Sequence, residues 1–153
     1  MAALRLEELT AKTIVAARNL ALKPGQESFL QPETYVHSEA QLDPAASWPR
    51  VVVDGEDGDD VVGYIMGTFD PNASDDYLRA ALWRVNVEAS AQGKGVGRFA
   101  VKALADEARR RGFTRLTVVW ASGEAGPEEF FKAVGFELVG ETPYGEKLGA
   151  LTL

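Results

Sequence analysis

The spacing of apolar residues predicts that the chain opens with one strand and two helices. Leu4, Leu6 and Leu9 suggest a first strand. Thr10 is a suitable N-cap for an amphipathic helix that runs to Leu22 and ends before Pro24-Gly25. A second short helix is predicted over residues 32–42, because a proline begins it and an Asp-Pro pair follows it.

A β-hairpin and a third strand are predicted next. Val51–Val53 and Val61–Met66 are apolar runs separated by the Gly- and Asp-rich turn Asp54–Asp60, so the two strands should be antiparallel. A polar loop over residues 70–76 leads to residues 79–87, which alternate as a half-buried strand and run into a glycine-rich turn.

The second half of the chain predicts a βαβ unit followed by a closing antiparallel pair. Helical spacing extends from Gly97 to Arg111, and Gly112 ends that helix. Leu116–Trp120 has the near-continuous apolar character of a buried strand. Pro127 begins a last helix that reaches Val134. The closing strands are predicted at Phe136–Val139 and Leu148–Leu153.

Composition indicates one globular domain over residues 1–153, with 46% hydrophobic and 25% charged residues. No stretch approaches the roughly 20 apolar residues of a membrane span, so we expect a soluble, cytoplasmic protein without a membrane partner. Cysteine is absent, which excludes disulfides and thiolate chemistry. The net charge of -7 argues against nucleic acid as a partner and suits a cationic substrate, or it serves only solubility.

The turn that precedes the Gly97 helix is the strongest chemical signal in the sequence. Three glycines let backbone N–H groups approach a ligand closely at a helix N-terminus, where the helix dipole favours an anion such as a pyrophosphate. Two basic side chains supplement that field, and no metal is needed. The residues predicted to hold the anion are Gln92, Gly93, Lys94, Gly95, Val96, Gly97 and Arg98.

Three other readings of this turn are weaker. A Walker A loop requires Ser or Thr after Gly-Lys, which the turn lacks. Gly95-x-Gly97-x-x-Ala100 matches the dinucleotide fingerprint, but that motif should open the domain and be followed about 20 residues later by an acid. A helix begun by glycines for structural reasons alone does not explain three of them.

These residues resemble the GCN5-related N-acetyltransferase (GNAT) superfamily. Gln92, Gly95 and Gly97 match its [QR]-x-x-G-x-[GA] motif, and Phe130–Phe136 resembles its [LF]-Y-x-x-x-G-F segment. The flanks are similar to a bacterial branch of spermine/spermidine or diamine acetyltransferases. That similarity lies in Gln26-x-x-Phe29, in Leu82-Trp83-Arg84, and in the ending from Gly140-Glu141 through Gly145-Glu146 to Leu151.

The resemblance implies an α/β (α+β) fold with a mixed, mostly antiparallel sheet of six to seven strands flanked by about four helices. The sheet would splay between its fourth and fifth strands, residues 79–87 and 115–120. Acetyl-CoA would be the co-substrate. Backbone groups of Val85 and Val87 would bind its pantetheine arm, and the N–H near Val87 would polarise the thioester carbonyl. A homodimer is among the assemblies that the resemblance allows.

Two positions depart from the family pattern. Phe131 stands where the family commonly has the tyrosine that protonates the departing thiolate, although Phe131 would still line the cofactor site. Tyr144 is the substitute acid that we consider, and otherwise it is a turn residue after Pro143. Glu124 stands where the family usually has an asparagine that helps to seat the CoA arm.

The acceptor side is encoded more weakly. Glu88 and the acidic residues Glu27, Glu33 and Glu39 could bind a cationic amine or take its proton, or they could be solvated surface. Trp83 could line the acceptor slot, and the single histidine is an alternative base. We expect direct acetyl transfer to a primary amine, such as spermidine or spermine. Alternatives are an amino acid, an aminoglycoside, a protein amine, or a role as an acyl-CoA-binding sensor.

Overall fold

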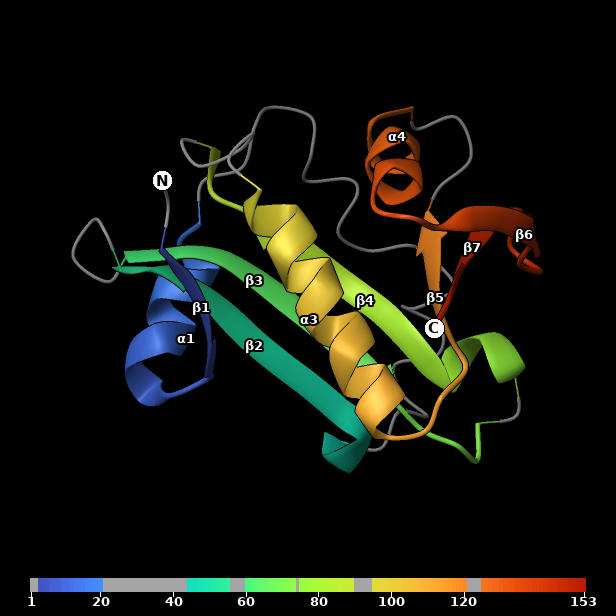
Figure 1. Cartoon of the computed structure of the whole chain (residues 1–153), viewed down its shortest axis with the longest axis horizontal. Helices are drawn as coiled ribbons and strands as arrows, with labels where there is room; N and C mark the ends of the chain where they lie inside the picture. Colours follow the sequence, from blue (N-terminus) through green and yellow to red (C-terminus); the bar gives the residue numbers. More distant parts are fainter. Residues whose placement is uncertain (1–2, 21–43, 56–59, 74, 90–94, 121–124) are drawn as a thin grey trace.

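The computed structural model describes residues 3–20, 44–55, 60–73, 75–89, 95–120 and 125–153 (Figure 1). The strands within them are β1 (Leu4–Glu8), β2 (Ser47–Asp54), β3 (Asp60–Phe69), β4 (Ala80–Val87), β5 (Arg115–Trp120), β6 (Glu137–Glu141) and β7 (Lys147–Thr152). The α-helices are α1 (Ala11–Arg18), α3 (Val96–Arg110) and α4 (Ala125–Ala133). A 3-10 turn, η5 (Asp76–Leu78), precedes β4.

The strands form one sheet in the order β1-β2-β3-β4-β5-β7-β6. Every neighbouring pair is antiparallel except β4 and β5, which are parallel because α3 connects them as a crossover. The predicted hairpin is confirmed, with Asp54 opposite Asp60 at its end. The mixed, mostly antiparallel sheet expected from the sequence is therefore present.

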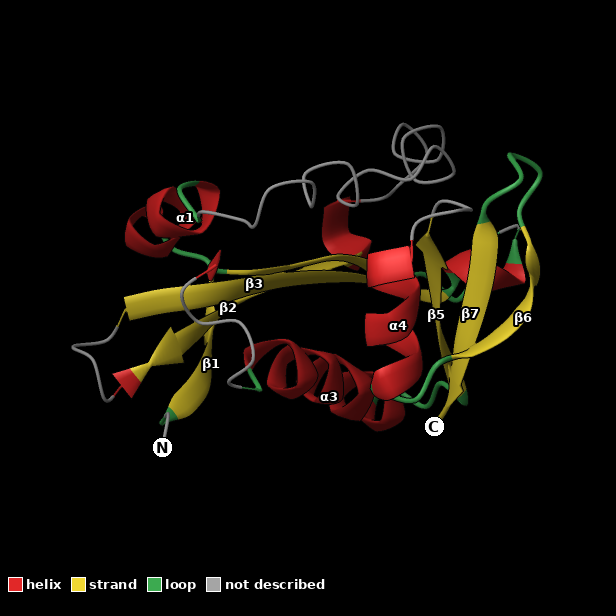
Figure 2. Ribbon diagram, turned by 90° about the horizontal axis from the view of Figure 1, so that it is seen from above, coloured by secondary structure: helices red, strands yellow, loops and turns green. Residues whose placement is uncertain are grey.

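Helices cover both faces of the sheet. Figure 2 shows α3 along one face and α1 on the opposite face, with α4 beside β5. The apolar stripe of α3 builds the main core, in which Ala100, Leu104 and Ala108 are fully buried against the strands. Gly67 of β3 lets Leu104 reach the backbone, because a Cβ at Gly67 would collide with the leucine methyl groups.

The first helix is shorter than its apolar pattern predicts. Thr10 caps it as expected, in a capping box with Thr13, but the helix ends at Arg18 rather than Leu22. The N–H of Asn19 bonds back to the Val15 and Ala16 carbonyls, which closes the last turn. The predicted extension to Leu22 lies partly outside the described residues, whose first range stops at Leu20.

The strand β2 is longer than predicted, because it starts at Ser47 instead of Val51 and includes Pro49. Pro49 lies opposite Met66 of β3, whereas the pairing with β1 begins only at Arg50. A proline is tolerated there because its missing N–H falls on the side that has no β1 neighbour. The apolar run alone therefore placed the start of this strand too late.

Of the four expected helices, three fall on residues that the structure describes. Three α-helices lie among the described residues, and the predicted helix over residues 32–42 falls outside them. The last helix begins at Ala125, two residues before the predicted start at Pro127. Proline fits this position because the N–H groups of a first helical turn have no intrahelical acceptor.

Candidate active site

The strands β4 and β5 are joined only at one end. Their parallel pairing consists of Ala81 with Thr117 and Leu82 with Val118. The hydroxyl of Thr117 donates to the backbone carbonyl of Tyr77, and the Ala80 carbonyl lies 3.3 Å from the same oxygen. Beyond this closed end the strands diverge, with β4 running toward the upper left of Figure 1 and β5 rising beneath α4. The predicted splay is therefore confirmed.

A β-bulge in β4 lies where the splay begins. Met66 of β3 is opposite Arg84, but the next residue, Gly67, is opposite Leu82, so Trp83 is the extra residue. A bulge bends its strand and increases the local twist. It also places Trp83 and Arg84 on the same face of the sheet, while Val85 returns to the α3 face. The bulge thus turns the second half of β4 away from β5.

The direction of the β4 backbone follows from the hydrogen bonds that β4 makes with β3. The Glu88 N–H donates to the Val62 carbonyl at 2.9 Å, which makes this pair a hydrogen-bonded one. Hydrogen-bonded and non-hydrogen-bonded pairs alternate along an antiparallel ladder. Val85 and Val87, opposite Ile65 and Gly63, are therefore non-hydrogen-bonded pairs. Their N–H and C=O groups point away from β3, toward the diverging β5.

The α3 helix begins at the open end of the splay. Its N-cap, Gly95, has φ +83°, the left-handed conformation in which glycine is unstrained. The Phe99 N–H makes the first helical bond, to the Gly95 carbonyl at 2.9 Å, so the amides of Val96, Gly97 and Arg98 precede the bonded ladder. A Cβ built at Gly95 would meet no atom within 4 Å.

The first turn of α3 is wedged between β3 and α4. A Cβ at Gly97 would lie 2.9 Å from ring carbons of Phe130, and a Cβ at Gly63 would lie 2.9 Å from Val96. The Arg98 guanidinium donates to the Ala133 carbonyl at the end of α4, at 3.1 Å. Arg98 was predicted to contact the anion, and here its side chain ties α3 to α4.

Phe131 lies in an aromatic cluster at the base of α4. It is 7% exposed, and its ring centroid lies 5.5 Å from that of Trp120 and 5.8 Å from that of Phe136. Gly149 of β7 makes room for the Trp120 ring, because a Cβ there would lie 2.7 Å from it. The indole N–H of Trp120 is buried and has no hydrogen-bond partner in the described part of the chain.

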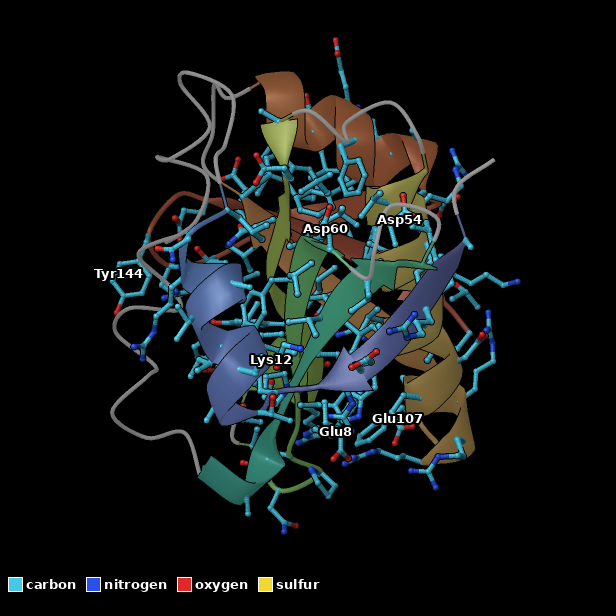
Figure 3. All side chains as sticks on the ribbon, turned by 90° about the vertical axis from the view of Figure 1, so that its left-hand side faces the viewer. Glu8, Lys12, Asp54, Asp60, Glu107 and Tyr144 are labelled. Atoms are coloured by element: carbon cyan, nitrogen blue, oxygen red, sulfur yellow. The ribbon has the colours of Figure 1, made fainter. Side chains whose placement is uncertain are left out.

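Tyr144 is not part of this aromatic cluster. It is half exposed on the turn between β6 and β7, which lies on the α1 side of the sheet in Figures 2 and 3. Burial, Asp75 and then Tyr144 raise the pKa of Tyr77, so Tyr144 lies near Tyr77. Phe131 packs on the α3 side instead. The structure therefore does not bring Tyr144 beside Phe131.

Polar residues of β4 occupy the face opposite α3. Arg84, Asn86 and Glu88 alternate with Val85 and Val87, whose side chains pack into the α3-side core. Trp83 is buried on this second face in a small cluster that includes Ala81, Val119 and Leu148. The remaining predicted contacts, Glu27, Glu33, Glu39 and Gln92, Gly93 and Lys94, lie outside the described residues, as does Glu124.

The sequence interpretation missed Asn86 and Tyr64. Asn86 lies opposite Tyr64, and burial raises the pKa of that tyrosine while the nearby Arg84 charge opposes the shift. The available signal was an asparagine inside a strand, where asparagine is depleted. Its alternation with Val85 and Val87 already placed it on the face opposite their side chains.

The described residues hold no group of three or more histidine, cysteine, aspartate or glutamate side chains that could bind a metal ion. None of the helices in the described ranges has the length and apolar character needed to cross a membrane.

The fold matches solved acetyltransferase structures over nearly the whole chain. An acetyltransferase from Thermus thermophilus aligns with TM-score 0.71 and 22% identity, covering 98% of this chain and 97% of the other. PaiA N-acetyltransferase from Thermoplasma acidophilum, solved with coenzyme A, gives 0.70 and 12%, covering 99% of both chains. The ribosomal-protein-S18-alanine N-acetyltransferase from Escherichia coli gives 0.64 and 16%, covering 97% and 93%.

A comparison with curated protein sequences gives no match. The profile of the acetyltransferase (GNAT) family, however, matches residues 14–136, which include β4, the glycine turn, α3 and α4. The chain therefore belongs to the acetyltransferase (GNAT) family, whose members are CoA-dependent N-acetyltransferases.

Proposed function

We propose that this protein transfers an acetyl group from acetyl-CoA directly to a primary amine. The observation that carries the proposal is the direction of the β4 backbone, because Val85 and Val87 present their peptide groups to the side on which β5 diverges. A thioester arm laid along this edge can continue the sheet by backbone hydrogen bonds. The side chains of Val85 and Val87 play no part in this role.

The residues at the open end fit the phosphate end of acetyl-CoA. Gly95 adopts the left-handed conformation at the N-cap, and the amides of Val96, Gly97 and Arg98 precede the first helical hydrogen bond. A pyrophosphate is favoured there by both hydrogen bonding and the helix dipole. Gln92, Gly93 and Lys94 would complete the turn. When bound, acetyl-CoA supplies the thioester whose carbonyl carbon the amine attacks.

Two groups of this chain serve the reaction in the proposal. The Val87 N–H donates to the thioester carbonyl oxygen and stabilises the negative charge that develops there. Glu88, immediately after β4, accepts the proton that the amine must lose. Tyr144, the proton donor considered from the sequence, lies on the α1 side near Tyr77. In this proposal the thiolate leaves unassisted, which a thiol pKa of about 8.5 makes feasible.

We also propose that the acceptor is a polyamine such as spermidine or spermine. The net charge of -7 favours encounter with a polycation, and Glu27, Glu33, Glu39 and Trp83 would contact it. Each exposed ion pair contributes only about 0.2–1 kcal/mol, so several must act together. A cytoplasmic location suits both substrates, and a homodimer is compatible with the proposal.

A thiol-release assay with acetyl-CoA and an amine panel tests this function. We expect spermidine to be acetylated with a higher kcat/KM than a neutral-tailed monoamine, an amino acid or an aminoglycoside. The preference should shrink at high salt, and it should fall cumulatively in Glu27→Gln, Glu39→Gln and the double variant. Equal rates for all amines would contradict the polyamine assignment. Tight acetyl-CoA binding without turnover would instead indicate a sensor.

A further inference from the structure

Within the described residues, the side-chain carbonyl of Asn86 is a buried acceptor without a donor. Its Oδ1 is inaccessible to solvent and has no hydrogen-bond partner in the part of the chain that the structure describes. Buried polar atoms are almost always hydrogen-bonded in native proteins, because an unsatisfied one lowers stability. An orphaned acceptor therefore needs an explanation, and a ligand that the structure does not contain is one.

The position of Asn86 makes a ligand role specific. Asn86 lies between Val85 and Val87, the two residues whose backbone faces the splay. Its side chain projects from the opposite face to theirs, the face on which α1 lies and α3 does not. Asn86 therefore lies at the same height along β4 as the proposed thioester edge.

Two residues of opposite charge flank Asn86 on its face of the sheet, Arg84 before it and Glu88 after it. Arg84 forms no ion pair within the described ranges, and its charge acts to lower the pKa of Tyr64 against the effect of burial. The Arg84 charge disfavours the protonated form of a nearby amine, while Glu88 is placed to take the proton that the amine loses.

We propose that Asn86 determines acceptor specificity by accepting a hydrogen bond from the attacking primary amine. The inference rests on the proposed acetyl transfer. A neutral carbonyl holds one N–H of the amine and leaves the nitrogen lone pair for the thioester carbon. A carboxylate at the same place would instead stabilise the unreactive ammonium form. The proton itself leaves to another group, for which Glu88 is the candidate.

The variant Asn86→Leu separates this role from a structural one. Leucine has nearly the same shape and removes the orphaned acceptor, so the melting temperature should stay the same or rise. We expect KM for the amine to increase at least tenfold, about 1.4 kcal/mol in binding, while calorimetry gives an unchanged acetyl-CoA affinity. Asn86→Asp keeps an acceptor oxygen and should raise KM less than Asn86→Leu does.

Asn72→Leu is the matched control, because Asn72 is exposed in the turn after β3 and should leave both affinities unchanged. The inference is overturned if Asn86→Leu lowers the melting temperature without raising KM, or if it raises KM no more than Asn72→Leu does. If Asn86→Leu fails to fold, Asn86→Asp is compared with Asn86→Ala, which has no acceptor oxygen. The inference expects a lower KM for the amine in Asn86→Asp than in Asn86→Ala, and equal KM values overturn it. If the wild type binds acetyl-CoA and acetylates no amine, the proposed function itself has failed.

Discussion

Gly97 and Phe130 bring the backbone of α3 into contact with an aromatic ring of α4. A Cβ at position 97 would lie 2.9 Å from both Cε1 and Cζ of that ring. Gly97→Ala must therefore displace the ring or the first turn of α3, at a cost typical of overpacking, about 1–3 kcal/mol. We expect a lower free energy of unfolding in urea and weaker acetyl-CoA binding by calorimetry.

Gly140→Ala is the control for this prediction, because a Cβ there meets nothing within 4 Å and the backbone φ is not positive. It should change stability by less than about 0.5 kcal/mol. Adding Phe130→Leu to Gly97→Ala removes the colliding ring atoms, so the double variant should recover acetyl-CoA affinity. Failure to recover would mean that the first turn of α3, rather than the ring, is what moves.

The sequence predicted the elements that present the cofactor site, but not the geometry between them. Glycine spacing located the N-terminus of α3, and apolar runs located β4 and β5. The bulge at Trp83 depends on which β3 residue each β4 residue faces, and a single chain segment does not encode that register. Asn86 became informative only once its Oδ1 was found buried.

Gly95 tests the backbone cap separately from packing. Its φ of +83° strains any residue with a Cβ by about 1–2 kcal/mol, although an added Cβ itself would meet no atom within 4 Å. Asparagine tolerates this conformation and valine does not. Gly95→Val should therefore weaken acetyl-CoA binding at least tenfold, and Gly95→Asn should weaken it much less. Equal affinities for the two variants in calorimetry would show that the left-handed cap is not required for binding.

Glu107 lies near the C-terminal end of α3, where it is labelled in Figure 3. Its carboxylate accepts hydrogen bonds from the Arg110 guanidinium and from Arg111 Nε, the latter at 2.7 Å. The Arg111 guanidinium also lies 4.4 Å from the centre of the Phe69 ring. Hydrogen bonds from Arg110, opposed by burial and reinforced by Arg111, lower the pKa of Glu107 from 4.5 to about 2.

Because the folded pKa of Glu107 is below the unfolded one, its contribution to stability is present above pH 4.5 and is lost as the pH falls through about 2. Glu107→Gln should lower the free energy of unfolding by about 1 kcal/mol at pH 7, and the difference from wild type should vanish near pH 2. Asp106→Asn, which breaks an exposed pair with Arg109 on the same helix, should have a smaller effect. A pH-independent difference would contradict this assignment.

Substitutions at Phe131 and at Tyr144 test which position can supply the proton that the departing thiolate takes up. Phe131 stands at the position for which the family resemblance implies a proton-donating tyrosine, and its ring centroid lies 5.5 Å from that of Trp120. Phe131→Tyr should therefore retain the fold and raise kcat at neutral pH.

Tyr144 lies on the α1 side near Tyr77, so Tyr144→Phe should leave kcat within about twofold. The measurement is kcat for both variants under saturating acetyl-CoA and amine, with product release checked by a pre-steady-state burst. A fall in kcat of tenfold or more in Tyr144→Phe, with no gain in Phe131→Tyr, would make Tyr144 the acid and would require the turn between β6 and β7 to move toward the splay when substrates bind.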